Sequence, residues 1–278
     1  MTCERIDSNA PILVTVEGQR FQEAPVLPRI CVAPARAMYI GPGLQLAPHQ
    51  NVAATIAVAL ANPFQLRLWA VSEGWSEWQT ASCALIRSET LHHLQSTGPM
   101  AFLYMDPLTD RRQMLTEEQL GAGGIQLQSK AKDIGIQEAF AGFGLKPLAP
   151  SDARIARVVM AVERQPDAFG RIQEAANLAC LSPSRFRARF DKEVGLPFRR
   201  YRLWRRMALI MRVIAEGGSL TRAAQEAGFS SSAHLSSSFK KMFGLSASEV
   251  IALGVYIDLS EDQHWSGLHQ DESLSQCM

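Results

Sequence analysis

Short apolar and β-branched runs recur through the first 105 residues of the chain. They occupy residues 12–16, 29–32, 37–40, 55–60, 65–71, 83–86 and 101–105. Gly, Pro and Asn separate many of them, as in Gly41-Pro42-Gly43, Asn62-Pro63 and Gly98-Pro99. Short strands with regular turn signals are typical of a β-sandwich or barrel. We therefore predict a β-rich N-terminal domain.

The pattern becomes helical further along the chain. Residues 116–140 have helical character, with a weak point at the glycines of residues 121–124. Pro147 and Pro150 then break the pattern, because proline lacks an N–H group and biases its predecessor to extended geometry. From Ser151 onward the residues predict helices. The expected fold class is multidomain α+β, with a β-rich barrel and following helices over residues 1–145, an all-α domain over 151–253 and a polar acidic tail over 254–278.

Two stretches of the helical region share one plan, with corresponding positions 48 or 49 residues apart. Each has a short Ala-rich helix, a tight turn and a serine-capped helix that ends at a glycine, Gly195 or Gly244. This is helix-turn-helix geometry, in which the second helix enters the DNA major groove. The two predicted units cover about residues 171–192 and 219–242.

Charge supports this interpretation. Residues 151–250 hold 17 Lys and Arg against 9 Asp and Glu, a net charge of +8, whereas the rest of the chain has a net charge of −7. A basic domain beside an acidic one favours a polyanionic partner; the alternative is chance asymmetry on a solvated surface. No run approaches the ~20 apolar residues that span a bilayer. Residues 1–10 lack the apolar core of a secretory signal. The five scattered cysteines suit neither a disulfide framework nor a zinc site, so we predict a reducing cytoplasm.

A helical wheel separates an inward and an outward side of the first recognition helix. Phe186 and Phe190 point inward. The opposite and flanking positions hold Ser184, Arg185, Arg187, Ala188 and Arg189. Because arginine can make bidentate bonds to guanine, we expect this unit to read bases.

The second recognition helix carries smaller outward groups. Leu235 and Phe239 point inward. The outward, flanking and terminal positions hold Ala233, His234, Ser236, Ser237, Lys240 and Lys241. The two lysines suit phosphate contacts, which position a protein on DNA without reading sequence.

A long helix is predicted between the two units, over residues 197–215. At ~1.5 Å per residue it spans about 28 Å, which approaches the ~34 Å between successive major-groove entries on one face of DNA. Its first half is rich in arginine, and these side chains suit phosphate contacts. They are Arg199, Arg200, Arg202, Arg205 and Arg206.

Residues 151–253 resemble the AraC/XylS family of bacterial transcription regulators. The resemblance rests on Leu181-Ser182-Pro183-Ser184-Arg185-Phe186 and, above all, on Ala227-Gly228-Phe229-Ser230-Ser231 and Phe243-Gly244-Leu245-Ser246. It implies two helix-turn-helix units joined by one long helix. The base-facing positions that it implies are Ser184, Arg187, Ala188, Ser232, Ala233, His234, Ser236 and Ser237. Ser237, Ala247 and Val250 replace the family's usual Arg, Pro and Tyr, which weakens the expectation of base reading by the second unit.

Residues 37–107 look like the cupin-type sensor domain of such regulators, through Gly41-Pro42-Gly43, Pro48-His49 and His92. Metal-binding cupins use a His-x-His pair, a Glu and a further His. Here the pair is His49-Gln50-Asn51 and no Glu follows within twenty residues, so we predict no metal and no other cofactor. An organic-ligand pocket lined by His49, Asn51, Trp69, His92 and Tyr104 is one expectation. The alternative is that the aromatic residues are core and the histidines lie on the surface or are hydrogen-bonded.

These features predict a sequence-specific DNA-binding transcription regulator that responds to a small effector. We expect no enzymatic activity, because a catalytic cupin would need the metal. The family resemblance implies that residues 116–140 pair two copies into a homodimer, and RNA polymerase is a candidate partner besides double-stranded DNA. The alternative is a small-molecule-binding or enzymatic cupin whose basic C-terminus serves for association. The duplicated helix-turn-helix favours the regulator, since an enzyme has no need of it.

Overall fold

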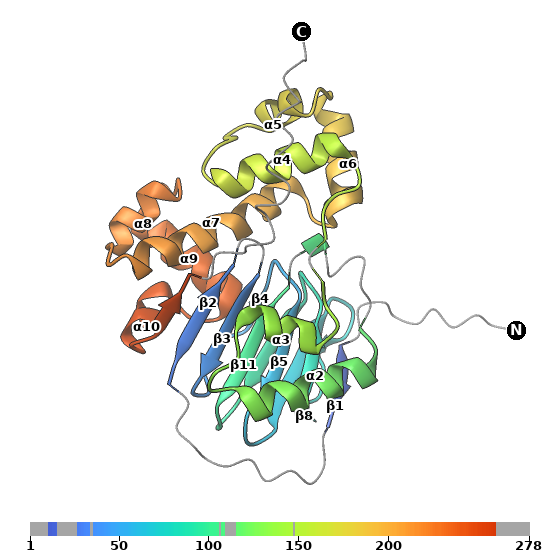
Figure 1. Cartoon of the computed structure of the whole chain (residues 1–278), viewed down its shortest axis with the longest axis vertical. Coiled ribbons are helices and arrows are strands. Elements are labelled where there is room, and N and C mark those ends of the chain that lie inside the picture. Colours follow the sequence, from blue (N-terminus) through green and yellow to red (C-terminus); the bar gives the residue numbers. More distant parts are fainter. Residues whose placement is uncertain are drawn as a thin grey trace, which may run out of the picture.

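The computed structural model describes residues 11–15, 27–33, 36–105, 107–108, 115–146 and 148–259. Figure 1 shows an N-terminal domain of β-strands with helices on one face, and the C-terminal helices at one end of the sheets. The predicted β-rich domain followed by an all-helical one is therefore confirmed. Across these ranges no helix is long and apolar enough to cross a membrane. Residues 1–10, considered for a secretory signal, and residues 260–278 of the predicted tail lie outside the described residues.

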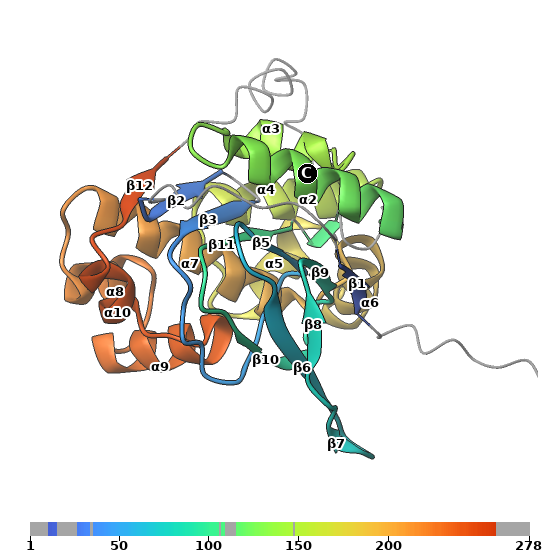
Figure 2. The same ribbon diagram turned by 90° about the horizontal axis from the view of Figure 1, so that it is seen from below.

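Two sheets form the N-terminal domain. The larger has the strand order β1-β9-β5-β11-β3-β2-β12, and the smaller has the order β4-β10-β6-β7 with β8 also paired to β6. Figure 2 shows the β6–β7 hairpin projecting from the rest of the domain. The strands are β1 (Ile12–Val14), β2 (Arg29–Val32), β3 (Ala37–Gly41), β4 (His49–Gln50), β5 (Thr55–Ala59), β6 (Phe64–Ala70), β7 (Gly74–Trp75), β8 (Gln79–Ala81), β9 (Cys83–Ile86), β10 (Leu91–Gln95), β11 (Met100–Tyr104) and β12 (Tyr256–Asp258).

The central strand β5 is buried on both faces, because successive side chains of a strand point to opposite sides. Ile56 and Val58 join the core beneath helices α2 (Glu117–Lys130) and α3 (Ile136–Gly142). Ala57 and Ala59 join the core between the two sheets. The domain is thus a three-layer arrangement of helices, large sheet and small sheet.

The glycines of residues 121–124 do not interrupt α2, which begins with a capping box between Thr116 and Gln119. A Cβ on Gly123 would lie 2.3 Å from Cδ1 of Phe143, and one on Gly124 would lie 3.4 Å from Sγ of Cys83. These glycines let α2 approach the sheet and the end of α3 closely. The close packing offsets the low helix propensity of glycine.

Both recognition helices begin at a serine cap and end at a glycine, as predicted. Ser182, Ser219 and Ser231 each accept a hydrogen bond from the backbone N–H three residues later. Gly195 and Gly244 adopt φ values of 85° and 78°, a left-handed conformation that suits glycine at a helix C-terminus. The helices are α4 (Ala153–Arg164), α5 (Ile172–Leu178), α6 (Pro183–Val194), α7 (Phe198–Ala215), α8 (Leu220–Glu226), α9 (Ser232–Phe243) and α10 (Ala247–Ala252).

After α10 the chain returns to the N-terminal domain. Strand β12 pairs in parallel with the edge strand β2, with Ile257 opposite Ile30, and the Tyr256 N–H donates to the Pro28 carbonyl at 3.0 Å. Figure 1 shows β12 beside β2. Val255 and Ile257 pack against the core of the C-terminal domain. Residues 254–278 were predicted to be a polar tail, and this strand within them was not predicted, because so short a run has no recognisable period.

Candidate nucleic-acid interface and interdomain cavity

An aromatic cluster fixes the orientation of α6, the first recognition helix. Phe186 and Phe190 are fully buried with ring centroids 5.5 Å apart, and each ring centroid lies 5.2 Å from that of Phe198 in α7. This packing leaves the opposite side of α6 in solvent. That side carries the exposed residues Ser184, Arg185, Arg187 and Ala188.

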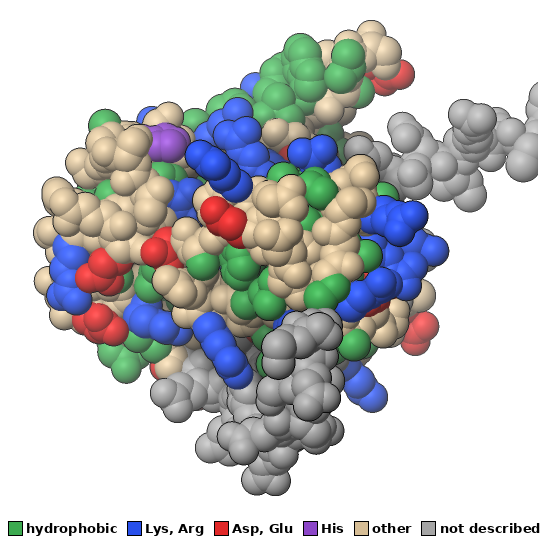
Figure 3. All heavy atoms as spheres, turned by 90° about the horizontal axis from the view of Figure 1, so that it is seen from above, with side chains coloured by type: hydrophobic (Ala, Val, Ile, Leu, Met, Phe, Trp, Pro, Cys, Tyr) green, Lys and Arg blue, Asp and Glu red, His purple; other side chains and the backbone are tan. Residues whose placement is uncertain are grey.

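A basic cleft lies beside α6. Its lining residues are Arg154, Leu181, Arg185, Ala188, Arg189 and Lys192. Arg154 comes from α4, outside the repeated units, so the sequence analysis did not include it. Figure 3 shows Lys and Arg side chains gathered on this side of the C-terminal domain, with others nearer α9. The cleft extends the basic surface of α6 onto a second helix.

One carboxylate lies among these cations. Asp152, the N-cap of α4, accepts bonds from Nη2 of Arg154 at 2.8 Å and from Nε of Arg189 at 2.6 Å. Hydrogen bonds from Arg154, and to a smaller extent from Arg189, hold the pKa of Asp152 well below its ordinary value. The structure therefore anchors Arg189 in an ion pair at the edge of the cleft.

The second recognition helix, α9, is held by buried Leu235 and Phe239. His234 contacts the turn of its own unit, with Nδ1 3.0 Å from Oγ of Ser230 and its ring centroid 5.3 Å from that of Phe229. Ser232 and Ser236 are half-buried. The exposed members of the predicted set are Ala233, His234, Ser237, Lys240 and Lys241.

Most of the five arginines in the first half of α7 face protein groups, and Arg199 alone of these five is exposed. The guanidinium of Arg202 donates to the Phe169 carbonyl. That of Arg206 donates to the Ala227 carbonyl and lies 3.8 Å from the centroid of the Phe229 ring. Burial lowers the pKa of Arg206 to about 10.

Two further arginines of α7 lie beside acidic side chains of the protein in this structure, and the predicted phosphate contact of Arg200 stays a prediction. Arg205 is 5% exposed, with Nη1 3.9 Å from Oε1 of Glu163, so it belongs to the core. Arg200 pairs with Glu89 of the N-terminal domain. A helical wheel gives the direction of a side chain but cannot say what other surface lies there.

In the N-terminal domain, the structure brings three of the predicted ligand residues together. His49 and His92 are buried cross-strand partners on β4 and β10, with ring centroids 4.2 Å apart. Each Nδ1 lies 2.9 Å from a backbone carbonyl, of Ala47 or Thr90. Burial lowers the pKa of His49 to about 3 and that of His92 to about 4, so both rings are neutral near pH 7.

Asn51 completes this group. Its Nδ2 donates to Oγ1 of Thr55 at 2.9 Å. Its buried Oδ1 has no hydrogen-bond partner among the described residues. Within the same ranges, no three His, Cys, Asp or Glu side chains cluster in a way that could hold a metal ion.

The other two predicted ligand residues lie elsewhere. Trp69 is 42% exposed on the projecting hairpin, 5.5 Å from Trp75 between ring centroids. Because His92 pairs with Leu68, the next residue, Trp69, points to the opposite face of the sheet. Tyr104 lies at the interface between the two domains, where its ring centroid is 6.0 Å from that of Trp204 and 5.4 Å from that of Phe243.

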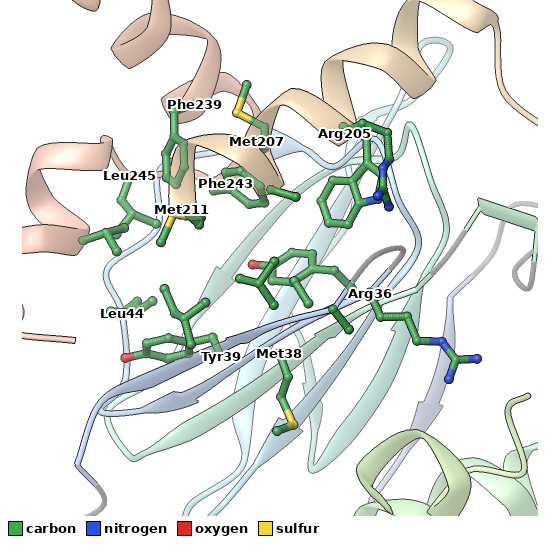
Figure 4. Close-up of a pocket in the computed structure, with 18 of the residues that line it drawn as sticks. Arg36, Met38, Tyr39, Leu44, Arg205, Met207, Met211, Phe239, Phe243 and Leu245 are labelled. Atoms are coloured by element: carbon green, nitrogen blue, oxygen red, sulfur yellow. The ribbon is translucent and has the colours of Figure 1, made fainter. Parts of the chain in front are cut away.

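Tyr104 lines an apolar cavity of about 80 Å³ between the domains. The N-terminal domain contributes β2, β3 and β11, and the C-terminal domain contributes α7, α9 and α10. In Figure 4, Met211, Phe239 and Phe243 lie across from Leu44 and Tyr39, whereas the guanidinium of Arg36 points away from the cavity. Two tyrosine hydroxyls belong to the lining. That of Tyr39 donates to the Pro42 carbonyl, and the other is that of Tyr104. This cavity was not predictable from the sequence, since its two walls are far apart along the chain.

Comparison with known proteins agrees with this geometry. Residues 175–252 match a family described as a helix-turn-helix domain. This part of the chain is a helix-turn-helix domain. The match begins in α5 and ends with α10, so it includes both recognition helices and excludes α4 and β12. The resemblance to AraC/XylS regulators is thereby confirmed, and this domain carries it.

A solved structure extends the likeness in fold to most of the chain. ToxT from Vibrio cholerae, in its 1.65 Å P21 form, is 11% identical, with a TM-score of 0.50, over 79% of this chain and 98% of that one. A ToxT structure with bound unsaturated fatty acid has 12% identity and a TM-score of 0.46, over 78% and 95% of the two chains. The DNA-binding domain of AdpA in complex with a target DNA is 25% identical over 36% of this chain and 91% of its own, with a TM-score of 0.32. No curated protein matches. The helix-turn-helix domain thus follows an N-terminal domain of the ToxT fold.

Proposed function

We propose that this protein is a sequence-specific DNA-binding transcription regulator of the AraC/XylS type, whose N-terminal domain responds to a small apolar molecule. The observation that carries the proposal is the pair of capped recognition helices, α6 and α9, whose outward sides remain exposed and basic. Helix α7 joins the two units in the chain, and its length suits two recognition helices that enter successive major grooves. The proposal assigns no catalytic role to the chain.

Salt dependence tests DNA binding by the full chain. Cationic side chains that neutralise phosphates release counterions, so the log of the affinity falls linearly with the log of salt concentration. We expect this slope with a labelled duplex of random sequence, and a smaller loss of affinity when the genomic operator is used. A flat response, or no binding at low salt, would contradict the proposal.

The interdomain cavity is the proposed effector site. Its lining is apolar apart from a few groups that include the Tyr104 hydroxyl and Arg205, whose buried Nε has no hydrogen-bond partner among the described residues. This chemistry suits an apolar molecule with one acidic or carbonyl end. Ligand sites usually measure about 300 Å³ or more. A ligand that enters a cavity of about 80 Å³ must therefore part the two domains.

An unsaturated fatty acid is a suitable probe, because it joins an apolar chain to a carboxylate. We expect it to raise the thermal midpoint of the full chain in a saturable way. Ala208→Phe fills the cavity and should abolish the shift, whereas the matched control Ala141→Phe, at an exposed position of α3, should keep it. An equal shift in both variants would place the ligand elsewhere.

The remaining partners stay proposals. A second copy of the chain, paired through residues 116–140, would bring two C-terminal domains to adjacent half-sites. Ile125 of α2 is 38% exposed, which leaves an apolar group for such a contact. RNA polymerase is a further candidate partner, and the cytoplasm is the proposed location.

A further inference from the structure

One ion pair joins the N-terminal domain to the connecting helix. Nε of Arg200 lies 3.0 Å from Oε1 of Glu89, and Nη2 lies 2.8 Å from Oε1 and 2.9 Å from Oε2. The two residues are 111 positions apart in sequence. The carboxylate therefore takes up the whole Nε–Nη2 edge of the guanidinium.

The backbone around Glu89 holds this carboxylate in place. Glu89 has a φ of 60°, a left-handed conformation that few residues other than glycine adopt. Its N–H donates to the Asn51 carbonyl at 2.8 Å, and its carbonyl accepts a hydrogen bond from the Gln50 side chain. Glu89 is thus fixed to the strand β4 and the residue that follows it.

The same part of the N-terminal domain also contacts the second recognition helix. The Ala47 N–H donates to the carbonyl of Gly244, the C-cap of α9, at 3.0 Å. A Cβ added to Gly244 would lie 2.7 Å from Nδ1 of His49. The start of α7 and the end of α9 are therefore docked on one end of the sheets, where Figure 1 shows α7 crossing above them.

Carboxylate and phosphate compete for an arginine in this geometry. Both anions accept two parallel hydrogen bonds from the planar guanidinium fork. A given edge of the fork holds one of them at a time. Arg200 stands next to exposed Arg199 at the start of α7, the helix between the two helix-turn-helix units.

We propose that Glu89 is an internal competitor of DNA phosphate for Arg200, and that this contact restrains DNA binding until the two domains separate. The proposal rests on the proposed function, because it presumes that the C-terminal domain binds DNA. In this arrangement, a molecule that parts the domains frees Arg200 and the end of α9 together. The N-terminal domain thereby regulates DNA affinity without touching a base.

The test is the affinity of the full chain for a labelled 40-base-pair duplex of mixed sequence, measured by fluorescence anisotropy. Glu89→Gln removes the charge and keeps the size of the side chain. We expect binding about threefold to fivefold tighter than wild type, since a partly exposed ion pair has a modest effect. Glu89→Gly, which suits the left-handed backbone, should give the same direction of change and guards against a folding defect.

Two controls separate this contact from a general effect of charge. Glu73→Gln also removes one negative charge from the N-terminal domain, at an exposed position between β6 and β7, and should leave DNA affinity within twofold of wild type. In an Arg200→Gln background, Glu89→Gln should add nothing. An equal gain from Glu89→Gln and Glu73→Gln, or a full gain from Glu89→Gln without Arg200, would overturn the proposal. If wild type binds DNA and Glu89→Gln shows no gain in DNA affinity, the proposal would also be overturned. Failure of wild type and all variants to bind DNA would instead contradict the proposed function, and this inference with it.

Discussion

The two helix-turn-helix units share one backbone plan and differ in chemistry and surroundings. Around α6 the surface is rich in cations, with Arg185 and Arg187 exposed and Arg154 added by α4. Around α9 the outward groups are small or are lysines at the end of the helix. Phe239 and Phe243 of α9 line the interdomain cavity, whereas α6 contributes no residue to it.

This difference separates two tasks. An arginine of the first unit can recognise guanine specifically, because its guanidinium matches the two acceptors of that base, O6 and N7. The second unit has little capacity for base readout but is coupled to the N-terminal domain through Gly244 and the cavity. We infer that the first unit supplies most of the DNA sequence specificity. The second unit supplies most of the coupling between DNA binding and the N-terminal domain.

The largest expected effect is on the first unit. Arg187→Ala should reduce the preference for operator over random DNA by about 5- to 150-fold, the loss of one good bidentate base contact. Ser237→Ala, at the outward side of α9, should change this preference little. Competition binding between operator and random duplexes measures both. If Ser237→Ala abolished the preference and Arg187→Ala kept it, the division of tasks would be reversed.

Acidification should lower the local stability of the second helix-turn-helix unit before that of the first. Burial lowers the pKa of His49 to about 3 and that of His92 to about 4, below their value of 6.5 when unfolded. Their contribution to stability is therefore complete above pH 6.5 and is lost as the pH falls toward 4, by about 1–2 kcal/mol per histidine at pH 5. We expect amide protection factors, which are corrected for the pH dependence of intrinsic exchange, to fall more in α9 than in α6 at pH 5. His49→Leu should reduce this acid sensitivity, and an unchanged pH profile in that variant would exclude the histidine pair as its source.

The close approach of α9 to the N-terminal domain can be tested at its C-cap. Gly244→Ala places a Cβ 2.7 Å from Nδ1 of His49 and 2.8 Å from the Ala47 carbonyl oxygen, at a φ of 78°. Gly217→Ala is a matched control, with a φ of 79° and open space around the new Cβ. Each should lose about 1 kcal/mol of folding free energy through its backbone conformation. Urea unfolding should show a greater loss of folding free energy for Gly244→Ala than for Gly217→Ala. Equal losses would mean that this contact is not maintained in solution.

Local features were predictable from sequence where one segment determines them. Helix periodicity and capping chemistry predict the serine N-caps, the glycine C-caps and the inward side chain of Phe186. The structure confirms them. Contacts between distant segments were not predictable. Nothing near Arg200 signals that Glu89 faces it, and nothing near Tyr104 signals a cavity shared with α7. The grouping of His49, Asn51 and His92 came from a family resemblance, whereas Trp69 was misplaced because strand alternation puts it on the other face.

The smallest expected effect concerns the end of α9. Lys240 is exposed. We expect its ammonium group to bind phosphate as a point charge, because it lacks the planar guanidinium with which arginine recognises a base. Lys240→Ala should therefore weaken specific and random duplexes alike, and should reduce the slope of log affinity against log salt by about one. Salt titrations of both duplexes measure this, with Lys146→Ala, outside residues 116–140, as a control of equal charge change. A loss confined to the operator would mean that Lys240 contacts a base, and the second unit would then share in sequence readout.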